Sequence, residues 1–135
     1  MIIYRRRKTM SNLYEGKIIE VKKGLFVDHP GIIVWNGFEW NVIHNSPKSG
    51  KVIMSSLSEF AEGRKIYSSN RYQSNLPTST IAHRARCRLG KSYSLASYNC
   101  QHFVTDACGI TPKSHDLHAF AFVCVIGFMG LAFRR

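Results

Sequence analysis

The sequence predicts an α+β domain in which a small antiparallel sheet packs against a few helices. Two β-rich runs, Gly31–Trp35 and Phe38–His44, flank Asn36-Gly37, a dipeptide typical of tight hairpin turns. Thr78–Leu89 repeats apolar residues at the spacing of one helical face. A later asparagine–cysteine pair marks the start of another amphipathic helix, so strand-like patterns precede helical ones along the chain.

The remaining elements follow from the same two patterns. Leu57, Phe60 and Ala61 give Ser55–Gly63 the pattern of a short amphipathic turn or helix. The helix that begins at Thr78 is expected to bury Ile81, Ala82, Ala85 and Leu89 and to end at Gly90. Further strands are expected at Ile18–Val21, Leu25–His29, Lys51–Met54 and Lys65–Tyr67.

Composition indicates a globular domain with an anionic partner. The chain has 135 residues, of which 44% are apolar, and its formal net charge is +11 with only 8 acidic residues. Such an excess of Lys and Arg favours an anionic membrane surface or nucleic acid as the partner. Neither a basic motif interleaved with aromatics nor a glycine-rich phosphate loop supports nucleic acid, so the expected partner is the membrane surface.

The four cysteines give a prediction about the compartment. Cys87, Cys100, Cys108 and Cys124 have no paired spacing, and no secretory signal precedes them. They therefore predict no disulfide framework, and we expect the domain in a reducing, cytoplasmic environment.

Two histidines are predicted to meet on the sheet. If Asn36 and Gly37 form a two-residue turn, His29 lies directly opposite His44, with Cβ atoms about 5 Å apart. Pro30 favours an extended His29 and indicates that this end of the strand is an edge or rim.

Cys100 has the position of an activated nucleophile. Asn99 is a preferred N-cap, so the thiol falls in the first helical turn, where the helix dipole and unpaired N–H groups stabilise thiolate. The same N–H groups are a candidate oxyanion site. With His29 as base and His44 as its orienting partner, the residue types fit thiol acyl-transfer chemistry.

We expect neither a metal nor another cofactor. A zinc site made of His29, His44, Cys100 and His102 lacks the paired ligand spacing of known zinc motifs. His102 falls inside the predicted helix, so we expect it to pack or to form a structural hydrogen bond.

The chain ends in an apolar segment. Ala119–Phe133 contains no polar side chain and is followed by two arginines. As a helix it would be roughly 22 Å long, against about 30 Å for a bilayer core, but it is apolar on every side. We expect residues 117–135 to form an apolar helix attached to or inserted in the membrane, preceded by a linker at 111–116. Residues 1–15 are expected to form a basic arm.

The cysteine motif resembles that of a known family. Asn99-Cys100-Gln101-His102-Phe103-Val104 is similar to the Asn-Cys-Glu-His-Phe signature of the lecithin:retinol acyltransferase-like (LRAT-like) family, which is a permuted relative of the NlpC-type papain-like peptidases. His29-Pro30-Gly31-Ile32-Ile33-Val34, Val42-Ile43-His44 and Gly16-Lys17-Ile18-Ile19-Glu20 resemble the family's two histidine strands and its opening strand. The resemblance implies a catalytic domain over residues 16–110.

The resemblance also implies a reaction and the residues for it. Cys100 would attack a phospholipid ester, His29 would act as base and later as acid, and His44 would orient His29. The acyl group would pass from a Cys100 thioester to an amine, an alcohol or water.

Departures from the family pattern are Gln101, Lys17, Pro30 and a short anchor. Two other functions remain open. One is a thiol peptidase or amidase on the same core, and the other is a non-catalytic membrane-binding protein.

Overall fold

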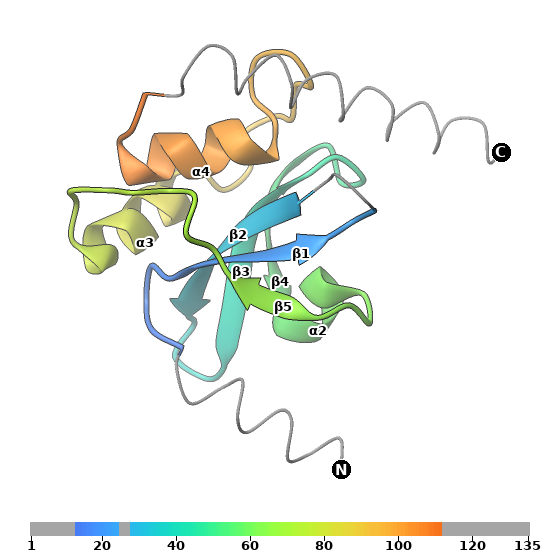
Figure 1. Ribbon diagram of the computed structural model, residues 1–135, viewed down its shortest axis with the longest axis horizontal. Coiled ribbons are helices and arrows are strands. Elements are labelled where there is room, and N and C mark those ends of the chain that lie inside the picture. The colour runs from blue at the N-terminus through green and yellow to red at the C-terminus, as the bar shows by residue number, and fades with distance from the viewer. Residues whose placement is uncertain (1–12, 25–27, 112–135) are drawn as a thin grey trace, which may run out of the picture.

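The protein is described by a computed structural model that covers residues 13–24 and 28–111. These residues form a five-stranded antiparallel sheet in the order β4-β3-β2-β1-β5, with helices on both faces (Figure 1). The predicted α+β class is confirmed. The elements are β1 (Ile18–Lys22), β2 (Asp28–Trp35), β3 (Trp40–Ser46), β4 (Lys51–Ser56), α2 (Leu57–Ala61), β5 (Ile66–Ser68), α3 (Thr78–Cys87) and α4 (Cys100–Cys108).

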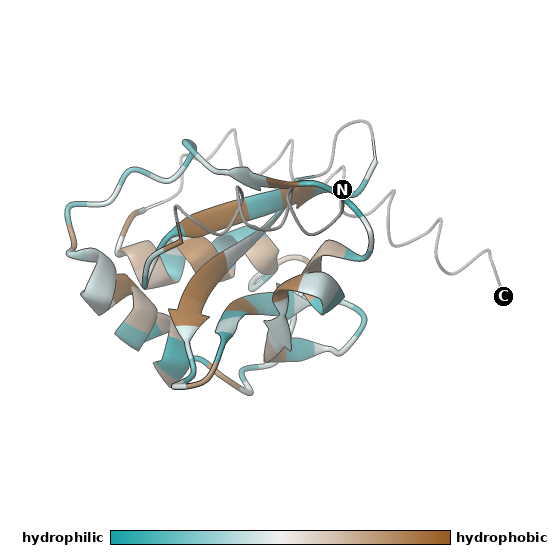
Figure 2. Ribbon diagram, turned by 90° about the horizontal axis from the view of Figure 1, so that it is seen from below, coloured by the Kyte–Doolittle hydropathy of each residue, from teal (hydrophilic) through white to brown (hydrophobic). Residues whose placement is uncertain are grey.

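The sheet separates two clusters of buried apolar side chains. On one face, Ile32 and Ile43 pack with Phe103 of α4 and with the buried stripe of α3. On the other face, Val42 packs with Phe60 of α2. Figure 1 shows α3 and α4 on one side of the sheet and α2 on the other, and Figure 2 shows the apolar stretches of the central strands between them.

The hairpin between β2 and β3 has a longer loop than the sequence predicts. Trp35 pairs with Trp40, so the loop contains the four residues 36–39, and the predicted two-residue turn is wrong. The side-chain oxygen of Asn36 accepts hydrogen bonds from the backbone N–H groups of Phe38 and Glu39, both at 2.8 Å. Asparagine thus closes the loop through its side chain, which competes with the tight turn that Asn-Gly favours.

The longer loop changes the register of His29 and His44. His29 pairs with Val21 of β1 and His44 with Ile53 of β4, so the prediction that the two histidines lie directly opposite each other is wrong. Because the register shifts by two residues, each side chain keeps its face of the sheet. Both imidazoles therefore still pack on Phe60, with ring-centroid distances of 5.5 Å and 5.0 Å.

β2 is one strand where the sequence predicts two that are separated at Pro30. Pro30 pairs with Glu20 of β1, and the ladder to β3 begins only at Ile32. Because proline has no N–H to donate, this position tolerates it, and it fits the rim that Pro30 predicts.

Most other elements agree with the sequence. Asn99 caps α4, and Gly109 ends it in the left-handed conformation. α3 buries Ile81, Ala82 and Ala85 as predicted, but it ends at Cys87, so Leu89 lies beyond it and is 42% exposed. The start of the predicted strand at 25–27, most of the arm and the apolar segment lie outside the described residues. Within 13–24 and 28–111, no helix is long and apolar enough to cross a membrane.

Candidate active site

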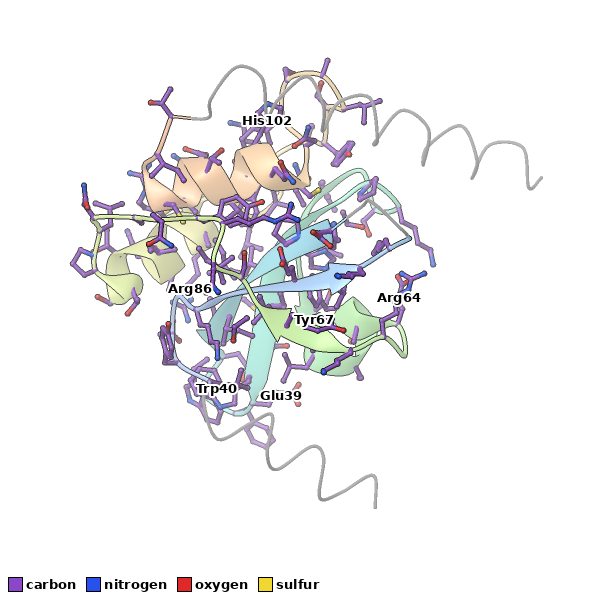
Figure 3. All side chains as sticks on the ribbon, in the orientation of Figure 1. Glu39, Trp40, Arg64, Tyr67, Arg86 and His102 are labelled. Atoms are coloured by element: carbon purple, nitrogen blue, oxygen red, sulfur yellow. The ribbon has the colours of Figure 1, made fainter. Side chains whose placement is uncertain are left out.

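The start of α4 is fixed by a reciprocal cap around Cys100. The side-chain oxygen of Asn99 accepts hydrogen bonds from the N–H groups of Gln101 and His102, at 3.0 Å and 3.1 Å. His102 returns the contact, because its Nδ1 accepts from the N–H of Asn99 at 3.1 Å. Figure 3 shows His102 beside α4, on the side away from the sheet. His102 therefore has the structural role that the sequence predicts.

This cap narrows the candidate oxyanion site. The N–H groups of Gln101 and His102 bond to the side chain of Asn99, so these two groups are removed from the expected set of oxyanion donors. The Cys100 side chain is 4% exposed and lies at the positive end of the helix.

Asn45 connects the strand of His44 to this helix start. Its side-chain amide donates to the backbone oxygens of Tyr98 and Asn99, at 2.7 Å and 3.3 Å, and the residue is fully buried. Since Asn45 follows His44 in β3, one histidine strand is bonded directly to the residues that precede Cys100. Figure 1 shows the first turn of α4 at the same end of the sheet as the start of β2.

His29 and His44 are hydrogen-bonded to each other. Nε2 of His29 lies 2.9 Å from Nδ1 of His44, and the rings meet edge to face. Nε2 of His44 lies 2.9 Å from the hydroxyl oxygen of Ser55 in β4. The structure thus forms a buried chain of three polar side chains, of which the sequence predicted only the two histidines.

Burial keeps both histidines neutral at physiological pH. It lowers the pKa of His44 to about 4, aided by the positive charge of Lys23 and opposed by Glu59. It lowers the pKa of His29 well below the ordinary value, with Lys23 and His44 contributing. A neutral imidazole has one bare nitrogen, which is what a general base requires.

Tyr72 is a neighbour of the thiol that the sequence did not predict. It packs against the core cluster that contains α4, and burial followed by the nearby Cys100 raises the pKa of its phenol. Its segment is held on both sides, by an ion pair between Arg71 and Asp28 and by a 2.6 Å hydrogen bond from Ser74 to the carbonyl of Cys108. Tyr72 also lines a groove of about 670 Å³ between β1, β5 and α3.

The other described cysteines differ from Cys100. Cys87 is exposed, and burial raises the pKa of the Cys108 thiol to about 11, which keeps it protonated. No cluster of three or more potential metal ligands occurs among residues 13–24 and 28–111. No local sequence pattern identifies Ser55, Asn45 or Tyr72 as part of the site, because each interacts there with a residue far away in the sequence.

A family model described as "Lecithin retinol acyltransferase" matches residues 11–110. The match includes both histidines, the capped cysteine and all five strands. No curated protein matches the chain.

Proposed function

Because the chain belongs to the lecithin retinol acyltransferase family, we propose that it is a membrane-associated enzyme that takes an acyl group from a phospholipid ester through a thioester at Cys100. Family membership indicates activity of the acyltransferase or phospholipase type. The acyl group then passes to an amine, an alcohol or water. The proposal assigns Cys100 as nucleophile, His29 as base and acid, and His44 as the residue that orients His29.

The hydrogen bond between the two histidines is the observation that carries this assignment. Since Nε2 of His29 is bonded to His44, the nitrogen left for the thiol proton is Nδ1. The bonds of Asn45 to Tyr98 and Asn99 support the assignment as well, because they join β3, the strand of His44, to the start of α4.

The proposed reaction has two halves. In the first, His29 takes the thiol proton, the sulfur bonds to the ester carbonyl carbon, and the carbonyl electrons move to oxygen. When the carbonyl re-forms, the ester C–O bond breaks and the leaving alkoxide takes the proton from His29. In the second, the acceptor gives its proton to His29 and attacks the thioester carbonyl carbon, and the C–S bond breaks. The thiolate then takes the proton back from His29, which restores the thiol and the neutral imidazole.

The charge around the site supports an anionic membrane as partner. Six lysines lie where β1 and β3 end and β4 and β5 begin, which is the end of the sheet that holds His29. We define this lysine rim as Lys22, Lys23, Lys48, Lys51, Lys65 and Lys91. Among the described residues, its one ion pair joins Lys23 to Glu62, at 3.9 Å. A rim of this charge is complementary to anionic lipid headgroups.

The compartment is part of the same proposal. The described cysteines, Cys87, Cys100 and Cys108, form no disulfide, and a thiol nucleophile requires a reducing environment to remain active. We therefore assign the catalytic domain to the cytoplasmic side of a membrane.

The test is the intact mass of the protein after brief incubation with mixed-acyl phosphatidylcholine vesicles. We expect wild type to gain one acyl group that hydroxylamine removes, and Cys100→Ala to gain none. Cys87→Ala is the matched control, because it removes an exposed thiol and should behave as wild type.

Two results would contradict the proposal. An adduct on Cys100→Ala would place the acyl group elsewhere. A wild-type protein without an adduct would favour a thiol peptidase if Cys100 still reacted with iodoacetamide, and a binding protein if it did not.

A further inference from the structure

The hydrogen-bond chain that runs from His29 to His44 does not end there, because His44 has a second buried partner. Nε2 of His44 and the hydroxyl oxygen of Ser55 are 2.9 Å apart, as are the two ring nitrogens that join the histidines. His29, His44 and Ser55 are 3%, 7% and 6% exposed. Water therefore has little access to this chain, and its members must satisfy one another.

The geometry points to Ser55 as a positioning residue that fixes which nitrogen of each histidine carries the proton. The inference rests on the proposed function, since it concerns how His29 is prepared to act on Cys100. Ser55 does not touch the thiol or the substrate in this scheme. It acts on His29 through His44.

The direction of the hydrogen bonds follows from the charged state of His29. When His29 has taken the thiol proton, both of its ring nitrogens carry hydrogen, so its Nε2–H must donate to Nδ1 of His44. His44 can accept there only if its own hydrogen is on Nε2. That hydrogen then needs an acceptor, and the hydroxyl oxygen of Ser55 is the atom in place.

The same direction suits the resting enzyme. If Ser55 accepts from His44 and His44 accepts from His29, then Nδ1 of neutral His29 is bare and can take a proton. The opposite direction would put a hydrogen on Nδ1 of His29, and the imidazole could no longer act as the base toward Cys100.

The surroundings of the two rings leave this hydrogen-bond chain as the main control on which nitrogen of His29 carries the hydrogen. Phe60 packs against both rings, at 5.5 Å and 5.0 Å between centroids, and offers no hydrogen-bonding group. The charged groups that face the histidines are Lys23, which opposes protonation of both, and Glu59, which favours protonation of His44. Removing the Ser55 hydroxyl leaves the buried Nε2–H of His44 without an acceptor. The neutral pair can avoid this by reversing its hydrogen-bond direction, but charged His29 forbids the reversal, so the loss falls on the catalytic state.

The test is the rate of Cys100 alkylation by iodoacetamide as a function of pH. In Ser55→Ala we expect the apparent thiol pKa to rise by about one unit and acyl transfer to fall about tenfold, which is the size of one lost buried hydrogen bond. Ser55→Thr keeps a hydroxyl and should restore both values to near wild type.

Ser46→Ala is the matched control. Ser46 is a similarly buried strand serine, but its hydroxyl accepts from the backbone N–H of Ser49 at 3.1 Å and forms no hydrogen bond with a described histidine. A purely structural role of Ser55 would change thermal stability in both alanine variants and leave the thiol pKa unchanged. That result would overturn the inference.

Nitrogen-15 spectra of the histidines in the wild-type protein give a second measurement that needs no variant. We expect His29 and His44 both as neutral rings with hydrogen on Nε2. Hydrogen on Nδ1 of His44 would overturn the inference.

His29→Ala distinguishes a failure of the proposed function from a failure of the role assigned to Ser55. If it leaves the thiol pKa and acyl transfer unchanged, the proposed function itself fails. If His29→Ala raises the thiol pKa and Ser55→Ala does not, the thiol–histidine pair holds and only the role of Ser55 is wrong.

Discussion

The two ends of the sheet differ in what they bury and what they expose. At the end where β2 begins, His29, His44 and Asn45 are between 0% and 7% exposed and are all hydrogen-bonded. At the hairpin end, Phe38 is 91% exposed and Trp35 is 42% exposed. Figure 3 shows Glu39 and Trp40 at the hairpin end and Arg64 at the other.

The comparison shows where this fold is sensitive to change. Removing an exposed aromatic ring from a loop changes the free energy of unfolding little, because most of the ring contacts water in both the folded and the unfolded chain. A buried polar group must keep its partner, and losing one costs about 1–3 kcal/mol. Small changes at the histidine end are therefore expected to have larger effects than large changes at the hairpin.

The first prediction concerns pH and has the largest expected effect. The folded pKa of His44 is about 4, against 6.5 for the exposed group, so between these values the unfolded chain binds more protons than the folded one. Stability that is present above pH 6.5 is therefore lost as the pH falls toward 4, by roughly 3 kcal/mol from this group. Denaturant unfolding at a series of pH values measures this loss of unfolding free energy.

His44→Asn is the control for the pH effect. It removes the titrating ring, so its free energy of unfolding should vary less between pH 7 and pH 4 than that of wild type. Equal pH dependence in both proteins would show that burial of His44 is not the cause.

The second prediction concerns Gly31, a buried residue of β2 two positions after His29. A Cβ at this position would lie 2.4 Å from a methyl group of Val42 and 3.0 Å from the Phe60 ring. Gly31→Ala should cost about 1–3 kcal/mol of unfolding free energy and reduce acyl transfer, because Phe60 supports both imidazoles.

Phe38→Ala tests the other half of the comparison. It removes a larger group, but at the exposed hairpin, and should change the unfolding free energy by less than about 0.5 kcal/mol. A larger loss for Phe38→Ala than for Gly31→Ala would reverse the contrast between the two ends.

The smallest expected effect concerns the lysine rim. Lys65 lies over the ring of Tyr67, with its amine 5.0 Å from the centroid, and Lys17 lies over Tyr14 toward the hairpin end at 5.7 Å. Lys65→Glu should weaken binding to phosphatidylserine-containing vesicles about tenfold at low salt, and Lys17→Glu should weaken it less. Equal losses would mean that total charge, not the rim, decides the binding measured by vesicle sedimentation.

The sequence by itself determined the elements and the chemical types at the site. Apolar periodicity located the strands and α3, and Asn99 and Gly109 defined α4, because caps and amphipathic patterns depend on residues a few positions apart. The same local signals identified Cys100 and the two histidines, and placed both histidines on one face of the sheet.

Only the tertiary structure decided how these residues meet. The side chain of Asn36 lengthened the hairpin loop, which changed the register that Asn-Gly predicts. The chain from His29 through His44 to Ser55 crosses three strands, and the bond of Asn45 to the residues before Cys100 spans more than fifty positions. Such contacts depend on the pairing and packing of whole elements, which residues a few positions apart do not determine.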